Sequence, residues 1–112
     1  TIMGDAAIGF AGMDLETATR HRIPILVMVL NNHVLSGYSR NYPMAAEKFG
    51  FTNLYGEYAN VAKALGAYGE RVEDPSEIVP AIKRAQTAMA AGQPALLEFM
   101  TKEENTLSHQ TR

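Results

Sequence analysis

An acidic residue and an amide residue follow two apolar stretches of this chain, at places where strands of a sheet would end. Residues 4–7 have the sequence Gly-Asp-Ala-Ala and come directly after the apolar stub of residues 1–3. Residues 24–30 form a continuous apolar run that two asparagines follow. In open α/β sheets, ligands bind beyond the carboxyl ends of the strands, so Asp5 and Asn32 are candidates for one shared site.

The oxygen atoms of these residues suit a hard metal ion. Mg²⁺ prefers an octahedron of oxygens and combines one or two protein oxygens with phosphate oxygens and water. Asp5 offers a carboxylate oxygen and Asn32 an amide oxygen, and the backbone carbonyl of Val34 could supply a third ligand. The simpler alternative is that Asp5 caps a turn and that Asn31 and Asn32 only end a strand.

Small residues flank the acid. Gly4, Ala6 and Ala7 allow the backbone to approach a diphosphate closely. Main-chain N–H groups at a turn that enters a helix form an anion site. The two stretches together therefore predict a site for a metal ion and a diphosphate.

Composition limits the class of protein. The chain has 112 residues, 46% of them hydrophobic, and a net charge of −2, which predicts one domain or part of one and no surface for nucleic acid. No apolar stretch approaches the roughly 20 residues of a membrane helix. There are no cysteines, so disulfides and thiol chemistry are excluded and a cytoplasmic location is expected. The apolar stub at Thr1 predicts that the domain is truncated at its N-terminus and forms the C-terminal part of a larger protein.

Strands and helices are expected to alternate. The predicted strands are residues 1–3, 25–30, 67–72 and 95–100, and the predicted helices are residues 13–20, residues 57–65 and a segment from Asp74 to Gly92. This order predicts an α/β fold with a three-layer parallel sheet, right-handed crossovers and helices on both faces. Two helices show apolar stripes at helical spacing, formed by Tyr58, Val61, Ala62 and Leu65 and by Ile78, Ile82, Ala85 and Met89.

Two segments are expected to lack regular structure. Residues 33–56 form a long connection, which predicts an active-site or interface loop. Within it, Arg40 could bind a substrate carboxylate or a coenzyme A phosphate, although a subunit contact or plain exposure fits as well. The polar tail, residues 101–112, is expected to fray or to dock on another segment.

The stretch from Gly4 to Asn32 resembles the cofactor signature of thiamine-diphosphate-dependent enzymes, GDG followed by a double asparagine. Pro24 before the second strand and an acid at position 14 or 16 also match. Residues 57–67, 72–75 and 92–98 resemble later parts of that family's pyrophosphate-binding domain, so the resemblance covers about residues 1–100. It is greatest to acetolactate synthase-like members and to 2-hydroxyacyl-CoA lyase or oxalyl-CoA decarboxylase-like members.

The resemblance implies the cofactors thiamine diphosphate and Mg²⁺. It assigns Asp5, Asn32 and the Val34 carbonyl as metal ligands, and it places Gly4, Ala6 and Ala7 along the diphosphate. Ala6 and Ala7 stand where the signature usually has Gly and Ser, which removes one possible phosphate contact. The implied reaction forms or cleaves a C–C bond in 2-keto acids or 2-hydroxyacyl substrates.

The resemblance also implies partners. The glutamate that activates the cofactor belongs to a pyrimidine-binding domain, usually of another subunit, which implies a homodimer or homotetramer and an inactive fragment. Within the chain, only His33 is a catalytic candidate, through substrate contact or proton transfer, and an ordinary loop residue is the alternative. Two other hypotheses are a non-catalytic α/β module that kept the fold and a subunit of a split decarboxylase. Receiver-like and dinucleotide-binding domains fit less well, because Asp5 has no neighbouring acid and no G-x-G-x-x-G motif follows a strand.

Overall fold

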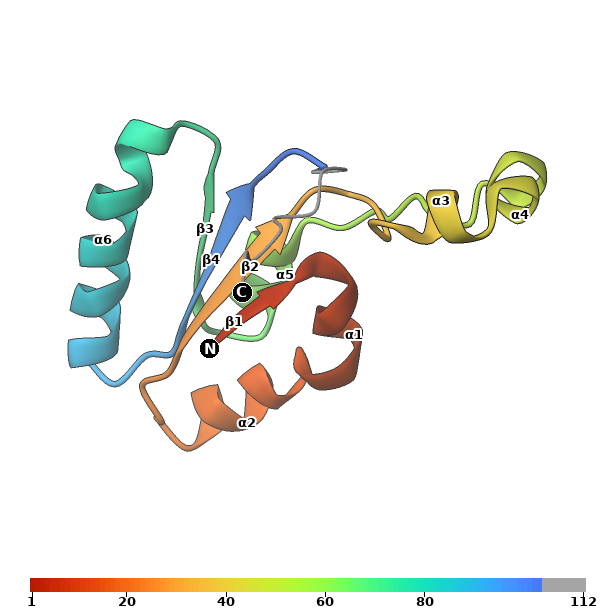
Figure 1. Ribbon diagram of the computed structural model, residues 1–112. Coiled ribbons are helices and arrows are strands. Elements are labelled where there is room, and N and C mark those ends of the chain that lie inside the picture. The colour runs from red at the N-terminus through yellow and green to blue at the C-terminus, as the bar shows by residue number, and fades with distance from the viewer. Residues whose placement is uncertain (104–112) are drawn as a thin grey trace, which may run out of the picture.

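The computed structural model describes residues 1–103 and contains a sheet of parallel strands in the order β1-β2-β4-β3 (Figure 1). The strands are β1 (Ile2–Gly4), β2 (Leu26–Asn31), β3 (Tyr68–Val72) and β4 (Ala95–Met100). All four predicted strands are present within a residue or two of their expected bounds. The prediction for the tail falls mostly on residues 104–112, outside the described residues.

The register brings the ends of neighbouring strands together. Gly4 pairs with Leu30, and Asn31 pairs with Met100. Because every pair in this sheet is parallel, the carboxyl ends of all the strands lie along one edge. The residues that follow β1 and β2 are therefore neighbours at that edge.

Helices cover both faces of the sheet, as the sequence predicted (Figure 1). One core joins β2 and β4 to α2 (Asp14–Arg20) and α5 (Tyr58–Ala64), and the other joins β3 and β4 to α6 (Ile78–Ala90). Strands that are buried on both faces are typically apolar along most of their length, as β4 is apart from Glu98. Within residues 1–103, no helix is both long and apolar enough to cross a membrane.

The helix ends follow the sequence, and the apolar stripes do so with two exceptions. In α6, Ile78 belongs to the predicted stripe but is 39% exposed. The Asp74 side chain accepts a hydrogen bond of 2.8 Å from the backbone N–H of Ser76 and so caps the short 3-10 helix η2 (Pro75–Glu77) that leads into α6. In α5, however, Val61 is 44% exposed, although it was expected on the buried face. The helix instead turns Ala59 and Ala62 to the sheet, since these small side chains allow a closer approach.

The connection of residues 33–56, called here the excursion, is more regular than predicted. It contains two short helices, α3 (Tyr38–Asn41) and α4 (Pro43–Phe49), where an irregular loop was expected. Figure 1 shows the excursion reaching away from the sheet. An antiparallel bridge between Val34 and Asn53 closes its base.

Two short helical segments follow β1. The 3-10 helix η1 (Asp5–Ala7) begins at the predicted acid and passes into α1 (Ile8–Ala11). The sequence predicted only small, turn-prone residues here. The site residues after β1 thus lie at the start of a helical segment.

Candidate functional site

A cavity of about 560 Å³ lies at the carboxyl edge of the sheet, between the end of β1, the end of β2 and the start of the excursion. Its lining includes most of the residues that the sequence singled out: Gly4, Asp5, Ala6, Asn32 and Val34. Ala7 is not among the lining residues. The fold therefore brings the two polar stretches together, as expected from their places at neighbouring strand ends.

Asp5 is the most buried of these residues, with 4% of its surface exposed. Its Oδ1 accepts a hydrogen bond of 3.0 Å from the backbone N–H of Ala6. Its Oδ2 accepts one of 2.9 Å from the backbone N–H of His33. Both carboxylate oxygens are thus oriented by main-chain donors from the two segments that form the cavity, and each keeps lone pairs for a further ligand.

Asn32 and Val34 lie on the turn that follows β2. The Asn32 Oδ1 accepts a hydrogen bond of 3.1 Å from the Val34 N–H, and its Nδ2 donates one of 2.8 Å to the Ser36 hydroxyl. Among residues 1–103, no hydrogen bond uses the carbonyl oxygen of Val34. That oxygen is available to a ligand in the cavity.

This donor set fits Mg²⁺. Within residues 1–103, no three His, Cys, Asp or Glu side chains gather as a metal cluster. The cavity instead offers one carboxylate, one side-chain amide and one main-chain carbonyl. Hard oxygen ligands in small number, completed by phosphate oxygens and water, are what Mg²⁺ takes.

The backbone beside Asp5 leaves room for an anion. Gly4 has φ −76°, a conformation that any residue can adopt, and nothing lies within 4 Å of where its Cβ would be. Neither the backbone nor the packing of residues 1–103 requires a glycine at this position. The missing side chain keeps the mouth of the cavity open. The Ala6 N–H, expected to face the diphosphate, is already bonded to Asp5.

The other chemical candidates of the sequence are less central. His33 adopts a left-handed backbone conformation, with φ 61°, and is not among the residues that line the cavity. Of the residues in α3, Tyr38 lines the cavity and Arg40 does not. The structure therefore gives the His33 backbone a place beside Asp5 but places neither the His33 ring nor Arg40 against the cavity.

The sequence did not single out a buried polar pair beneath the cavity. Asn31 and Glu98 are both fully buried, and Nδ2 of Asn31 donates a hydrogen bond of 2.7 Å to Oε1 of Glu98. The charges of Glu98 and Asp5 add to burial in raising the pKa of the Tyr58 hydroxyl. A single acid in the apolar strand β4 was the signal that could have identified Glu98.

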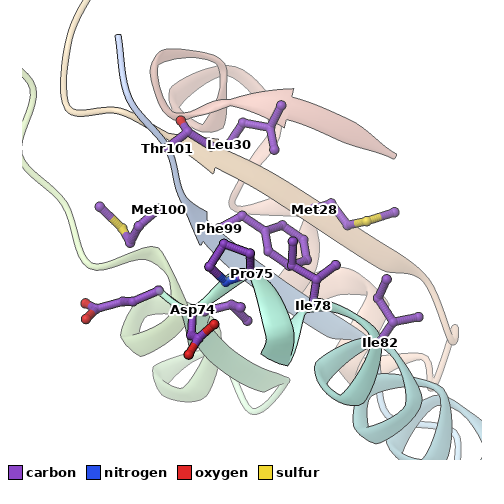
Figure 2. Close-up of a pocket in the computed structure, with 11 residues that line it drawn as sticks. Met28, Leu30, Asp74, Pro75, Ile78, Ile82, Phe99, Met100 and Thr101 are labelled. Atoms are coloured by element: carbon purple, nitrogen blue, oxygen red, sulfur yellow. The ribbon is translucent and has the colours of Figure 1, made fainter.

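A second cavity, of about 290 Å³, lies on the face of the sheet that α6 covers, between β2 and the start of α6 (Figure 2). Figure 2 shows its mainly apolar walls, which include Met28, Phe99 and Ile78. Leu30 borders both cavities, so the end of β2 separates them. The polar residues that line the second cavity are Glu73, Asp74 and Thr101, and the Asp74 carboxylate already caps η2.

The chain matches the family described as "Thiamine pyrophosphate enzyme, C-terminal TPP binding domain" over residues 1–99. The acetolactate synthase large subunit IlvG of Mycobacterium tuberculosis is 35% identical over 111 residues. The match covers 89% of this chain and 18% of that protein. 2-Hydroxyacyl-CoA lyase 1 of Homo sapiens is 27% identical, with 94% of this chain and 20% of the lyase covered. The chain thus spans only a minor part of the curated relatives it matches.

Solved structures show the same fold. A thiamine diphosphate-dependent 4-hydroxybenzoylformate decarboxylase of Rhodococcus jostii superposes with a TM-score of 0.70 at 20% identity, over 94% of this chain and 20% of that chain. The benzoylformate decarboxylase of Polynucleobacter necessarius gives a TM-score of 0.71 at 19% identity, over 93% of this chain and 19% of the decarboxylase. The match to the family description, with this fold, confirms the resemblance drawn from the signature. The chain belongs to the thiamine pyrophosphate enzyme family as a C-terminal TPP-binding domain, and enzymes of this family use thiamine diphosphate together with Mg²⁺.

Proposed function

We propose that this domain holds the diphosphate of thiamine diphosphate through one Mg²⁺ ion at the carboxyl-edge cavity. Asp5, Asn32 and the carbonyl of Val34 are the protein ligands of the metal, and Gly4, with the backbone of η1, borders the diphosphate. The observation that carries the proposal is the convergence of all three ligand residues on one cavity, from the ends of two neighbouring strands. Asp5 and Asn32 lie far apart in the sequence, and no local turn would bring them together.

We place this domain in an enzyme that forms or cleaves a C–C bond next to a carbonyl. The substrate class is a 2-keto acid or a 2-hydroxyacyl compound, which the names of the acetolactate synthase and 2-hydroxyacyl-CoA lyase relatives support. When bound, the cofactor supplies a carbon nucleophile and an electron sink for such a reaction. This chain's residues bind the diphosphate, fix its orientation and border the space in which the cofactor lies.

The rest of the active site is proposed to come from outside these residues. The chain covers 18% of the length of the acetolactate synthase relative, so most of such an enzyme lies elsewhere. We propose that a pyrimidine-binding domain of another subunit supplies the rest of the active site. The subunits would form a homodimer or homotetramer, located in the cytoplasm. The excursion, with its exposed aromatic side chains, is our candidate for the contact with that subunit.

Calorimetric titration of the whole protein with thiamine diphosphate tests the metal site. We expect binding in the presence of Mg²⁺ and its loss when EDTA removes the metal. Asp5→Asn should weaken binding at least about tenfold, because it replaces the one carboxylate of the proposed ligand set.

Asp14→Asn is the matched control, since Asp14 is exposed on α2 and does not line the cavity. It removes the same charge and should leave the affinity unchanged. Binding that is insensitive to EDTA and to Asp5→Asn would overturn the metal site. A folded whole protein that binds no thiamine diphosphate at all would favour the alternative of a non-catalytic module.

A further inference from the structure

Two polar side chains meet inside the face of the sheet that α2 and α5 cover. Asn31, the last residue of β2, and Glu98, on the neighbouring strand β4, are both 0% exposed. Their hydrogen bond, from Nδ2 of Asn31 to Oε1 of Glu98, measures 2.7 Å. Burial of a carboxylate is costly unless donors satisfy it, so the presence of this pair in an otherwise apolar layer needs a reason.

The second oxygen of Glu98 bonds a helix. Its Oε2 accepts a hydrogen bond of 2.9 Å from the backbone N–H of Ala59, in the first turn of α5. That N–H has no partner within its own helix, because the first turn of a helix lacks preceding carbonyls. Among residues 1–103, Glu98 forms no ion pair. Its charge is thus stabilised by two N–H donors, one from Asn31 and one from α5.

The carboxylate fixes the direction of the Asn31 amide. A carboxylate can only accept hydrogen bonds, so Asn31 must present its NH₂ group to Glu98 and its Oδ1 to the other side. There, Oδ1 accepts a hydrogen bond of 3.0 Å from the backbone N–H of His33. With the amide reversed, an NH₂ group would face the His33 N–H, and two donors would oppose each other.

The His33 N–H joins this pair to the cavity. It is shared between Oδ1 of Asn31 and Oδ2 of Asp5, which lies 2.9 Å away. His33 stands between Asn32 and Val34 and adopts a left-handed conformation that is unfavourable for a residue other than glycine. The two acceptors hold the centre of the turn in that conformation.

We propose that Glu98 is a positioning residue for the metal site. Through Asn31, it holds the His33 turn in the shape that directs Asn32 and the Val34 carbonyl toward the same cavity as Asp5. This inference rests on the proposed function of that cavity. It predicts that Mg²⁺ affinity depends on the donor–acceptor direction of a buried pair that does not line the cavity.

Exchanging the acid and the amide between positions 31 and 98, in the whole protein, tests the donor–acceptor direction of their hydrogen bond. Glu98→Gln places an NH₂ group against a donor, and Asn31→Asp places two carboxylates against each other. The double variant restores the three bonds of the pair: the new glutamine accepts from Ala59 and donates to the new aspartate, whose other oxygen accepts from His33. It loses only the long bond of 3.5 Å that Nδ2 of Asn31 donates to the Gly56 carbonyl. Calorimetry measures the Mg²⁺ affinity of each variant at saturating thiamine diphosphate. The unfolding temperature of each variant is measured separately.

We expect each single variant to bind Mg²⁺ roughly ten to a hundred times more weakly, as is typical when a group that orients metal ligands is lost. The double variant should recover an affinity within about threefold of the wild type, a rescue that loss of packing would not produce. Glu16→Gln, which removes an exposed carboxylate from α2, is the control and should bind like the wild type.

Unchanged Mg²⁺ affinity in both folded single variants would overturn the inference while leaving the proposed function intact. If the single variants do not fold, the double variant decides. A folded double variant that stays tenfold weaker contradicts the positioning role. A wild-type protein that binds neither Mg²⁺ nor thiamine diphosphate overturns the proposed function, and the inference with it.

Discussion

The Asp5 carboxylate accepts a hydrogen bond of 2.9 Å from the backbone N–H of His33, which lies 28 positions later in the chain. This bond ties the segment after β1 to the turn after β2. Asp5 also accepts from the Ala6 N–H, so one side chain organises both walls of the cavity. Within residues 1–103, in contrast, the Asn32 side chain bonds only to Val34 and Ser36, in its own turn. The two proposed side-chain ligands therefore differ in what they contribute to the fold.

Alanine substitutions should separate these contributions. Asp5→Ala removes the acceptor of the Ala6 N–H and one of the two acceptors of the His33 N–H, and we expect it to lower the free energy of unfolding by about 1–3 kcal/mol. Asn32→Ala should lower it by less than about 1 kcal/mol, because its bonds are local and partly exposed. Both should lose Mg²⁺-dependent binding of thiamine diphosphate. Urea denaturation and calorimetry give the two quantities, and equal stability losses would contradict this division.

Two glycines offer a matched pair of substitutions. In Gly69→Ala, the added methyl group would meet the carbonyl oxygen of Ala59 well inside contact distance, so α5 must move away from β3. We expect a loss of about 1–3 kcal/mol in the free energy of unfolding. In Gly4→Ala, the methyl group meets no atom within 4 Å, and the stability should be unchanged.

In cofactor binding, the two glycine substitutions should rank the other way, with Gly4→Ala causing the larger loss of affinity. Gly4→Ala fills the space that the diphosphate is proposed to use and should weaken thiamine diphosphate binding about tenfold. Gly69→Ala lies away from the cavity and should weaken it less, through α5 and Glu98 only. A Gly4→Ala protein with wild-type affinity would show that the diphosphate does not approach this backbone.

The elements that pack on the sheet were the ones that the sequence predicted well. β2 is apolar up to Asn31, and β4 is apolar apart from Glu98. α6 carries buried alanines and follows the short helix η2, which Asp74 caps. α4 was missed because it packs on no core, so no apolar stripe marks it: Met44 and Phe49 are 82% and 70% exposed. Its end signals were nevertheless present, Pro43 at the first position and Gly50 with φ 58° after the last.

Part of the site followed from the sequence for a similar reason. Asp5 and Asn32 each come directly after an apolar run, and parallel pairing then places them at one edge. The Asn31–Glu98 pair could not be predicted in this way. Its two members are 67 positions apart, and which asparagine of the two turns inward depends on the phase of β2 in the sheet. A lone acid within β4 signals only that some partner exists.

The ion pair on the outer side of β3 predicts a pH dependence of stability. Arg84 donates two hydrogen bonds to Glu70, of 2.6 and 3.1 Å, and this contact lowers the pKa of the Glu70 carboxyl below its ordinary value, with Tyr68 assisting. A carboxyl with a lowered pKa in the folded state adds stability above its unfolded pKa, about 4.3 for Glu, and loses it as the pH falls further. The pair should therefore weaken only in acid.

Arg84→Met should remove this dependence. Between about pH 5.5 and 3.5, the wild type should lose up to about 1 kcal/mol more unfolding free energy than the variant, since Arg84 is partly exposed and solvent screens the pair. Arg40→Met is the control, because Arg40 forms no ion pair within residues 1–103. Denaturant melts at several pH values supply the comparison, and parallel curves for wild type and Arg84→Met would contradict the assignment.

The excursion carries apolar side chains that its own fold does not cover. Tyr38 packs against Tyr42 and Phe51, with ring centroids 6.1 and 6.3 Å away, but Met44 and Phe49 on α4 remain exposed. Apolar groups gathered on a segment that reaches away from the sheet are typical of a protein interface (Figure 1).

We therefore expect Met44→Gln with Phe49→Gln to weaken subunit association of the whole protein by about tenfold or more, with the unfolding temperature of the domain unchanged because neither side chain enters a core. Sedimentation velocity over a range of concentrations measures the association. Val79→Gln, at an exposed position on α6, is the control and should assemble like the wild type.

If the double variant also assembles normally, α4 is not the subunit contact. Tyr38, which is exposed and lines the cavity, would then be explained by the cofactor or substrate that it borders.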